Sequence, residues 1–174
     1  MKHAMLAGAF LVASATLVAA DKGPKTARAE LKDAQGKVVA TAKLKQVKSG
    51  VKISLAANGL PAGAHAFHIH AVGTCEPPDF KTAGGHFNPE HKQHGMNNPE
   101  GPHAGDMPNF TVGANGKGKT SYVDTRVRLG EGDNSLFHEG GTALVIHEKA
   151  DDNMSDPAGN AGNRIACGVI EKSQ

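Results

Sequence analysis

The chain has 174 residues, of which 39% are hydrophobic, 21% are charged and only 4% are aromatic, a composition that excludes a disordered chain. Its 22 glycines and 9 prolines favour a turn-rich protein over a helical bundle. The net charge of +2 is too balanced for a protein that binds nucleic acid through bulk charge, so we expect no nucleic-acid partner.

The N-terminal segment predicts a secretory signal peptide. A charged start precedes an uncharged apolar run over residues 4–20, and small side chains end that run where a signal peptidase would cut. A short transmembrane anchor is the alternative, but the run is at the lower end of the spanning range and rich in Ala and Gly. We therefore expect export to the periplasm, removal of residues 1–20, and a mature chain, residues 21–174, that forms a single domain without a membrane segment.

Short β-strands follow along the rest of the chain, because apolar and polar residues alternate with a period of two. We expect strands at residues 26–31, 38–47, 51–55, 64–71, 110–112, 121–124, 142–147 and 164–170. Seven or eight such strands without helical periodicity predict an all-β fold, an antiparallel sandwich or barrel. Residues 73–109 and 148–163 do not fit as strands, and loops of this length are usually functional.

The chain has two cysteines, Cys75 and Cys167. Their spacing excludes a CxxC redox motif, and two thiols in an oxidising compartment favour a disulfide. A thiolate metal site is the less favoured alternative, because oxidation would remove a soft ligand there.

Histidine is the unusual residue of this sequence: ten are present, most of them in one stretch. His68 and His70 are two residues apart on the expected strand 64–71, so both side chains point to one face and form half of a metal site. His65 is offset from both by an odd number and points to the other face, where we expect it to bond backbone groups. His138 is expected to lie on the surface.

The long loop after this strand supplies a second group of candidate ligands. His86, His94 and His103 come at intervals of eight and nine residues, and Asp106 follows His103 by three. Nearby glycines and prolines let the loop fold tightly enough to bring these side chains together. Three imidazoles and one carboxylate suit tetrahedral Zn²⁺. His91 could compete with His94, but the spacing to His103 favours His94.

A fifth imidazole, His147, ends the expected strand 142–147 and could join His68 and His70. Three or four imidazoles with an open side suit copper. The ligands therefore exceed the needs of one metal, and two sites fit if one histidine serves both. His86 is the candidate for that shared ring, because it lies between the strand pair and the zinc loop in sequence.

Several segments closely resemble copper/zinc superoxide dismutases of the bacterial periplasmic branch: residues 67–70, 85–89, 92–95, 101–106, 143–152 and 159–170. The resemblance covers about residues 26–172. It implies an eight-stranded Greek-key β-barrel and an antioxidant enzyme that converts superoxide to O₂ and H₂O₂ with one copper and one zinc per subunit. It favours a homodimer and leaves a monomer open.

The resemblance also implies a role for each candidate residue. The copper ligands would be His68, His70, His86 and His147. The zinc ligands would be His86, His94, His103 and Asp106, with His86 bridging the two metals. Arg164 matches the arginine beside copper, Asp151 the carboxylate that links copper and zinc ligands, and Cys75–Cys167 the family's disulfide. Superoxide would be steered by positive charge near the opening, for which Lys81, Lys92 and Lys149 are candidates.

Two other classes of protein remain as alternatives. A periplasmic copper or zinc buffer would bind metal without turnover, but it would need neither Arg164 nor a shared imidazole and would usually hold Cu⁺ with Met or Cys. A disulfide-bonded adhesion domain with an incidental metal is a poor match to six convergent histidine ligands. Arg164 could also simply pair with a carboxylate.

Overall fold

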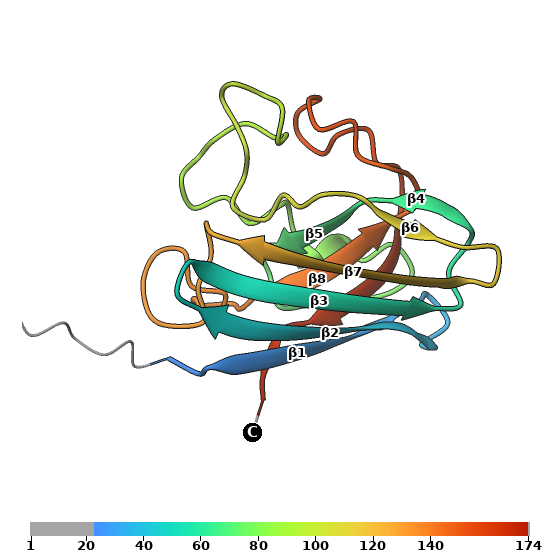
Figure 1. Ribbon diagram of the computed structural model, residues 1–174, viewed down its shortest axis with the longest axis horizontal. Coiled ribbons are helices and arrows are strands. Elements are labelled where there is room, and N and C mark those ends of the chain that lie inside the picture. The colour runs from blue at the N-terminus through green and yellow to red at the C-terminus, as the bar shows by residue number, and fades with distance from the viewer. Residues whose placement is uncertain (1–22, 174) are drawn as a thin grey trace, which may run out of the picture.

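The computed structural model describes residues 23–173, so the expected signal peptide lies outside the described residues. Between residues 23 and 173 the chain forms ten β-strands and one short 3₁₀ turn, η1, and no α-helix (Figure 1). The elements are β1 Thr26–Lys32, β2 Val38–Val47, β3 Gly50–Asn58, β4 Gly63–His65, β5 Phe67–His70, η1 Lys81–Ala83, β6 Phe110–Val112, β7 Lys117–Asp124, β8 Ala143–His147, β9 Arg164–Val169 and β10 Glu171–Lys172. The predicted all-β fold is confirmed.

The strands form one antiparallel sheet that wraps into a barrel. Neighbouring strands follow the order β4-β6-β7-β3-β2-β1-β9-β8-β5, with β10 paired to β1. The two ends of this order, β4 and β5, are separated in the chain only by Ala66, so the sheet closes on itself through that residue. The eight expected strands become ten because the strand expected at 64–71 divides at Ala66 and because β10 is a two-residue addition after β9.

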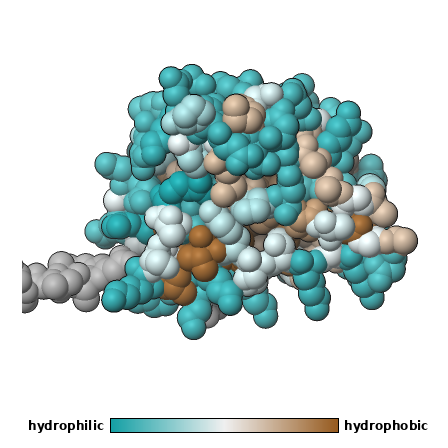
Figure 2. Space-filling view, turned by 45° about the horizontal axis from the view of Figure 1, so that its top comes forward, coloured by the Kyte–Doolittle hydropathy of each residue, from teal (hydrophilic) through white to brown (hydrophobic). Residues whose placement is uncertain are grey.

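The alternation seen in the sequence places small aliphatic side chains inside the barrel. On β1, Ala27, Ala29 and Leu31 are buried, and the residues between them are exposed. β2 and β3 continue this pattern and pair with each other over eight residue positions. Figure 2 shows a largely hydrophilic outer face on which hydrophobic residues are confined to small patches. No helix within residues 23–173 is long and apolar enough to span a membrane.

Three long segments leave the barrel. The two expected loops, 73–109 and 148–163, contain no strand, and they meet above one side of the barrel (Figure 1), where Asn97 N donates to Asn153 O at 3.0 Å. Gly95 has a φ of 112°, and a Cβ on it would collide with the same carbonyl, so the loops touch there through glycine. A third segment, 125–142, was not expected as a long loop.

Candidate metal centre

Backbone pairing around β5 brings the candidate histidines together. β5 and β8 are antiparallel, and all their side chains are buried, so His68 and His70 lie beside His147 with ring centroids 5.0 and 5.6 Å from it. The chain around His86 pairs along the other side of β5: Ala71 N donates to Gly85 O at 2.9 Å and Phe87 N to Ile69 O at 2.8 Å. His86 is thereby fixed beside the strand histidines.

In one group of four histidines, each ring has one buried nitrogen atom without a hydrogen-bond partner. Nδ1 of His68 and Nε2 of His70, His86 and His147 are buried and have no hydrogen-bond partner. Ligand atoms of these four residues lie within 4.8 Å of one another. Buried polar atoms are normally paired, so four converging orphans indicate lone pairs directed at a cation. An all-imidazole donor set fits copper.

The second ring nitrogens in this group do have partners. His68 Nε2 lies 2.7 Å from Asp151 Oδ2, and His70 Nδ1 donates to the carbonyl oxygen of Gly84 at 3.0 Å. A proton on the outer nitrogen leaves the inner nitrogen as the neutral donor that a metal requires. The surroundings therefore select the ligand tautomer.

A second group centres on Asp106. Its Oδ1 lies 2.8 Å from His86 Nδ1, 3.0 Å from His94 Nδ1 and 3.4 Å from His103 Nδ1. Ligand atoms of the four residues lie within 4.8 Å of one another, and the donor set of three imidazoles and one carboxylate fits zinc. His91 is exposed and belongs to neither group, so the structure brings in His94 and leaves His91 out.

His86 is the member that the two groups share. Its Nδ1 is turned to Asp106 and its Nε2 is the orphan atom of the other group. The His86 ring is 4.1 Å from that of His68 and 5.4 Å from that of His103, measured between centroids. Asp151 makes a second link, since its Oδ1 lies 3.0 Å from His94 Nε2 while its Oδ2 meets His68.

Burial keeps His86 and His147 in their binding form. It lowers the pKa of His86 to about 3 and that of His147 to about 4, so both rings stay neutral near pH 7. Burial alone would raise the pKa of Asp106, but hydrogen bonds from three imidazoles hold it well below its usual range. The Asp106 carboxylate thus stays ionised, as a metal ligand must.

Arg164, at the start of β9, is held by carbonyl groups. Its Nη1 donates to Phe80 O at 2.7 Å and its Nη2 to Gly84 O at 2.6 Å. It forms no ion pair with a carboxylate of residues 23–173, so the alternative of a simple salt bridge is wrong. Gly84 O also accepts from His70, which ties the guanidinium to a predicted copper ligand.

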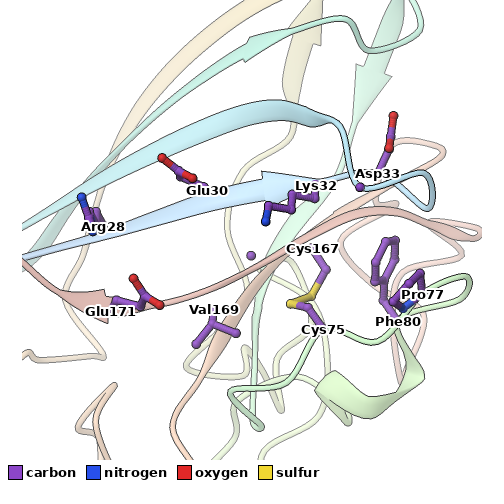
Figure 3. Close-up of a pocket in the computed structure, with 12 residues that line it drawn as sticks. Arg28, Glu30, Lys32, Asp33, Cys75, Pro77, Phe80, Cys167, Val169 and Glu171 are labelled. Carbon is purple, nitrogen blue, oxygen red and sulfur yellow. A yellow bond between two sulfur atoms is a disulfide. The ribbon is translucent and has the colours of Figure 1, made fainter.

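The expected disulfide between Cys75 and Cys167 is confirmed. Figure 3 shows it beside β1, with Phe80 of the following segment close by. The bond joins β9 to the segment that carries both carbonyl partners of Arg164. It lines a hollow of about 370 Å³ together with charged side chains of β1.

The structure adds contacts that sequence reasoning missed. Asn109 acts like a backbone partner: its Nδ2 donates to Asp151 O and its Oδ1 accepts from Asp151 N, both at 2.8 Å. His65 bonds backbone groups as expected, with its ring nitrogens 2.8 Å from His147 O and 2.9 Å from Pro61 O. His138 is not a free surface residue, because its ring stacks on Phe87 at 5.2 Å. No local pattern marks Asn109, since its partner lies 42 residues away.

Comparison with known proteins agrees with this geometry. The family model described as copper/zinc superoxide dismutase (SODC) matches residues 34–170. "Superoxide dismutase [Cu-Zn] 2" of Aquifex aeolicus is 54% identical over 168 residues, which cover 95% of this chain and 96% of that protein. A superoxide dismutase-like protein of Bacillus subtilis is 46% identical over 145 residues, 81% of this chain and 74% of its own length.

Solved structures give the same result. A crystal structure of a double mutant of a SOD-like protein from Bacillus subtilis has a TM-score of 0.79 and 44% identity, covering 82% of this chain and 95% of that one. The clock protein EA4 has a TM-score of 0.74 and 35% identity, covering 87% and 97%. With sequence family, barrel and both donor sets in agreement, the chain belongs to the copper/zinc superoxide dismutase family and is a superoxide dismutase that uses copper and zinc.

Proposed function

We propose that this chain carries out superoxide dismutation, 2 O₂⁻ + 2 H⁺ → O₂ + H₂O₂, at a two-metal centre in the periplasm. The copper ligands in this proposal are His68, His70, His86 and His147. The zinc ligands are His86, His94, His103 and Asp106. The single observation that carries the assignment is the shared His86 ring, with one nitrogen in each donor set.

Bound copper supplies one-electron oxidation and reduction, which zinc, a d¹⁰ ion, cannot do. Arg164 then has the task of binding the diatomic anion, since its planar guanidinium is always cationic. The carbonyls of Phe80 and Gly84 keep its donor fork in one orientation. His86 Nε2 is the atom that takes up a proton and passes it to the peroxide product. Asp106 and the zinc-side ligands keep the His86 ring in place while that proton moves.

Asp151 fixes the position of the candidate copper ligands relative to the candidate zinc ligands. One carboxylate oxygen accepts from His68 and the other from His94, so both rings present their remaining nitrogen to a metal. Partners of this kind fix ring orientation and raise ligand basicity. The backbone of Asp151 is in turn held by Asn109.

The test measures metal content and turnover in the same preparation. We expect one copper and one zinc per chain and cyanide-sensitive superoxide consumption. His86→Asn should lose activity and weaken both sites. His91→Asn is the matched control: it changes an exposed histidine of the same loop at a φ of 55°, which Asn tolerates, and should leave both metals bound. A wild-type protein that holds both metals and shows no turnover would favour the buffer.

Residues 1–20 are proposed as a signal peptide and residues 21–174 as one mature domain. The support is the charged start and the apolar run of the sequence. Fractionation of cells that express the chain with and without residues 1–20 tests this, and a full-length product retained in the cytoplasm would contradict it. A homodimer is proposed from the resemblance alone, and sedimentation of the metal-loaded protein decides between dimer and monomer.

A further inference from the structure

An ion pair between a buried carboxylate and a partly buried guanidinium closes the end of β7, on the side of the barrel that faces the zinc loop. Asp124, the last residue of β7, is fully buried. Its Oδ1 accepts from the backbone N of Arg126 at 3.0 Å and from Arg126 Nε at 2.9 Å. Asn134 Nδ2 donates to Arg126 O at 3.0 Å, so the third long loop also supports this turn. A buried carboxylate of this kind requires its cation.

The same guanidinium reaches the zinc loop. Arg126 Nη2 donates to the main-chain oxygen of Asp106 at 2.5 Å. The hydrogen bonds that hold the Asp106 carboxylate come from the loop itself, since Gly95 N and His103 N both donate to Oδ2 at 2.9 Å. Those contacts fix the shape of the loop, whereas Arg126 ties the Asp106 carbonyl group to the end of β7.

We propose that Arg126 is a positioning residue for the zinc site: anchored by Asp124, it holds the backbone of Asp106 and thereby the carboxylate on which three imidazoles converge. This inference rests on the ligand set proposed above. It assigns the Asp124–Arg126 pair a role in metal affinity in addition to stability. The connection runs from the end of β7 to a residue 20 positions earlier in the chain.

The geometry requires a guanidinium and not only a positive charge. Arginine presents five N–H donors on a rigid plane, so Nε can serve Asp124 while Nη2 serves the Asp106 carbonyl. A lysine ammonium is a compact point charge and cannot span the two acceptors in this way. Arg126→Lys should therefore keep the charge that Asp124 needs and release Asp106.

The experiment compares Arg126→Lys with Arg128→Lys in copper-free protein. Arg128 is the matched control, because it lies two residues on, is exposed, and its side chain donates to the local carbonyl group of Glu131. Zinc affinity is measured by competition with a chromogenic chelator, and Co²⁺ in the zinc site reports ligand geometry through its visible spectrum. We expect zinc affinity to fall about 10- to 100-fold in Arg126→Lys. The control should stay within about twofold of the wild type, a range of the kind expected for a surface change.

A second variant separates positioning from folding. Arg126→Ala would leave Asp124 without its cation and could unfold the protein for that reason alone, so the paired change Asp124→Asn with Arg126→Gln removes both charges together. The unfolding midpoint of each metal-free variant is recorded beside its zinc affinity. Weaker zinc binding and an altered cobalt spectrum in a variant that folds as the wild type does support the proposal. Zinc affinity that matches Arg128→Lys in both folded variants overturns it.

A third variant, Asp106→Asn, distinguishes this inference from the proposed function. If Asp106→Asn retains full zinc affinity, the ligand set is wrong, whatever Arg126 does. If Asp106→Asn loses zinc and Arg126→Lys keeps it, only the positioning role falls.

Discussion

Each of the four candidate copper ligands is a histidine with one ring nitrogen that meets a protein partner and the other left unpaired. Leaving a buried polar atom without a partner costs about 1–3 kcal/mol. Four such nitrogens converge at His68, His70, His86 and His147. The barrel therefore carries a local cost when metal-free, which ligation offsets, so metal binding stabilises the fold as well as enabling the chemistry.

Replacing Arg164 by Gln should lower kcat/KM by about one to two orders of magnitude, because the anion loses its oriented cation. Copper content should be unchanged, since Arg164 is not one of the four residues whose unpaired ring nitrogens would bind copper. Stopped-flow superoxide decay on protein of measured copper content checks this. Equal rates for Arg164→Gln and the wild type at low salt would refute the binding role.

The stability of the metal-free protein should be greatest near pH 6.5. His86 and His147 have folded pKa values of about 3 and about 4 against an ordinary 6.5, so their contribution is complete above pH 6.5 and is lost as the pH falls toward 4 and 3. His94 acts in the opposite sense. Burial lowers its pKa, but Asp106 and Asp151 raise it to about 9, so its contribution is complete below pH 6.5 and lost as the pH rises through 9.

Denaturant unfolding of metal-free protein between pH 4 and pH 9 measures this profile. His147→Gln should reduce the loss of unfolding free energy that we expect as the pH falls from 6.5 to 4. A free energy of unfolding that is constant from pH 7 down to pH 4 would show that these rings are not neutral in the folded protein.

Among the elements, the two long loops are held to the barrel by backbone contact. Ile69 N donates to Gly105 O at 3.0 Å and Gly105 N to Phe87 O at 2.8 Å, so the backbone at Gly105 is bonded both to β5 and to the segment that follows His86. A Cβ on Gly105 would collide with Ile69 O, which makes glycine necessary for this approach. The candidate ligands His86 and Asp106 each adjoin a residue that is hydrogen-bonded to Ile69 of β5.

Gly159→Ala should disrupt the link between the two donor sets. Gly159 has a φ of 63°, and a Cβ there would collide with Asp151 Oδ1 and press on His94 Nε2. Gly36→Ala is the matched control, with a φ of 81° and no atom within 4 Å of the added Cβ. Both changes strain the backbone, but only Gly159→Ala should weaken copper and zinc binding by about tenfold or more, as loss of a ligand's hydrogen-bond partner does.

Equilibrium metal competition on the two alanine variants makes this comparison. If Gly159→Ala and Gly36→Ala bind metal equally well, Asp151 does not hold the ligands in place.

Removing the disulfide by the paired change Cys75→Ser with Cys167→Ser should cost up to about 4–5 kcal/mol of stability, since the bond spans 92 residues. It should also lower kcat/KM, because the freed segment carries Phe80 O and Gly84 O, the two acceptors of Arg164. Unfolding of metal-free protein and kinetics of reloaded protein measure the two effects. Unchanged kinetics in a destabilised variant would limit the disulfide to a structural role.

Across the whole molecule, charge is segregated. Residues 25–58 carry eight Lys or Arg against two acids, whereas residues 59–174 carry nine against fourteen. β2, in the first region, is the middle strand of the sheet order and so lies across the barrel from the β4–β5 junction. The acidic excess falls in the part of the chain that holds the metal centre. An anionic substrate must therefore be attracted by local cations.

Of the three candidate steering lysines, two are paired: Lys81 with Asp79 at 2.9 Å and Lys92 with Glu90 at 2.8 Å. Lys149 forms no ion pair with the described part of the chain and lies beside Gly162, whose carbonyl contacts His147. Lys149→Gln should lower kcat/KM at low salt by about twofold and flatten its decrease with ionic strength. Lys43→Gln on β2 is the control. The same salt dependence in both variants would exclude steering by Lys149.

Period-two alternation and turn residues were enough to predict most strands, an antiparallel sandwich or barrel, and the two long loops, because burial of one strand face is a local constraint on sequence. The choice of a barrel came from the family resemblance. The candidate metal ligands were also identifiable, since His-x-His on a strand and the histidine spacing of the loop that follows it restrict which side chains converge. The strand break at Ala66 and the long loop at residues 125–142 were missed, because neither interrupts the local alternation of apolar and polar residues clearly enough to be recognised in the sequence.

The sequence by itself determined the all-β class, the residues available as ligands and the pairing of two cysteines, all of which follow from residue type and local period. Only the tertiary structure decided which nitrogen of each ring is free, that His86 faces both donor sets, and that carbonyls rather than a carboxylate hold Arg164. The physical reason is range: these contacts join backbone atoms and side chains far apart in the chain, and any residue can supply a carbonyl, so no sequence pattern marks them.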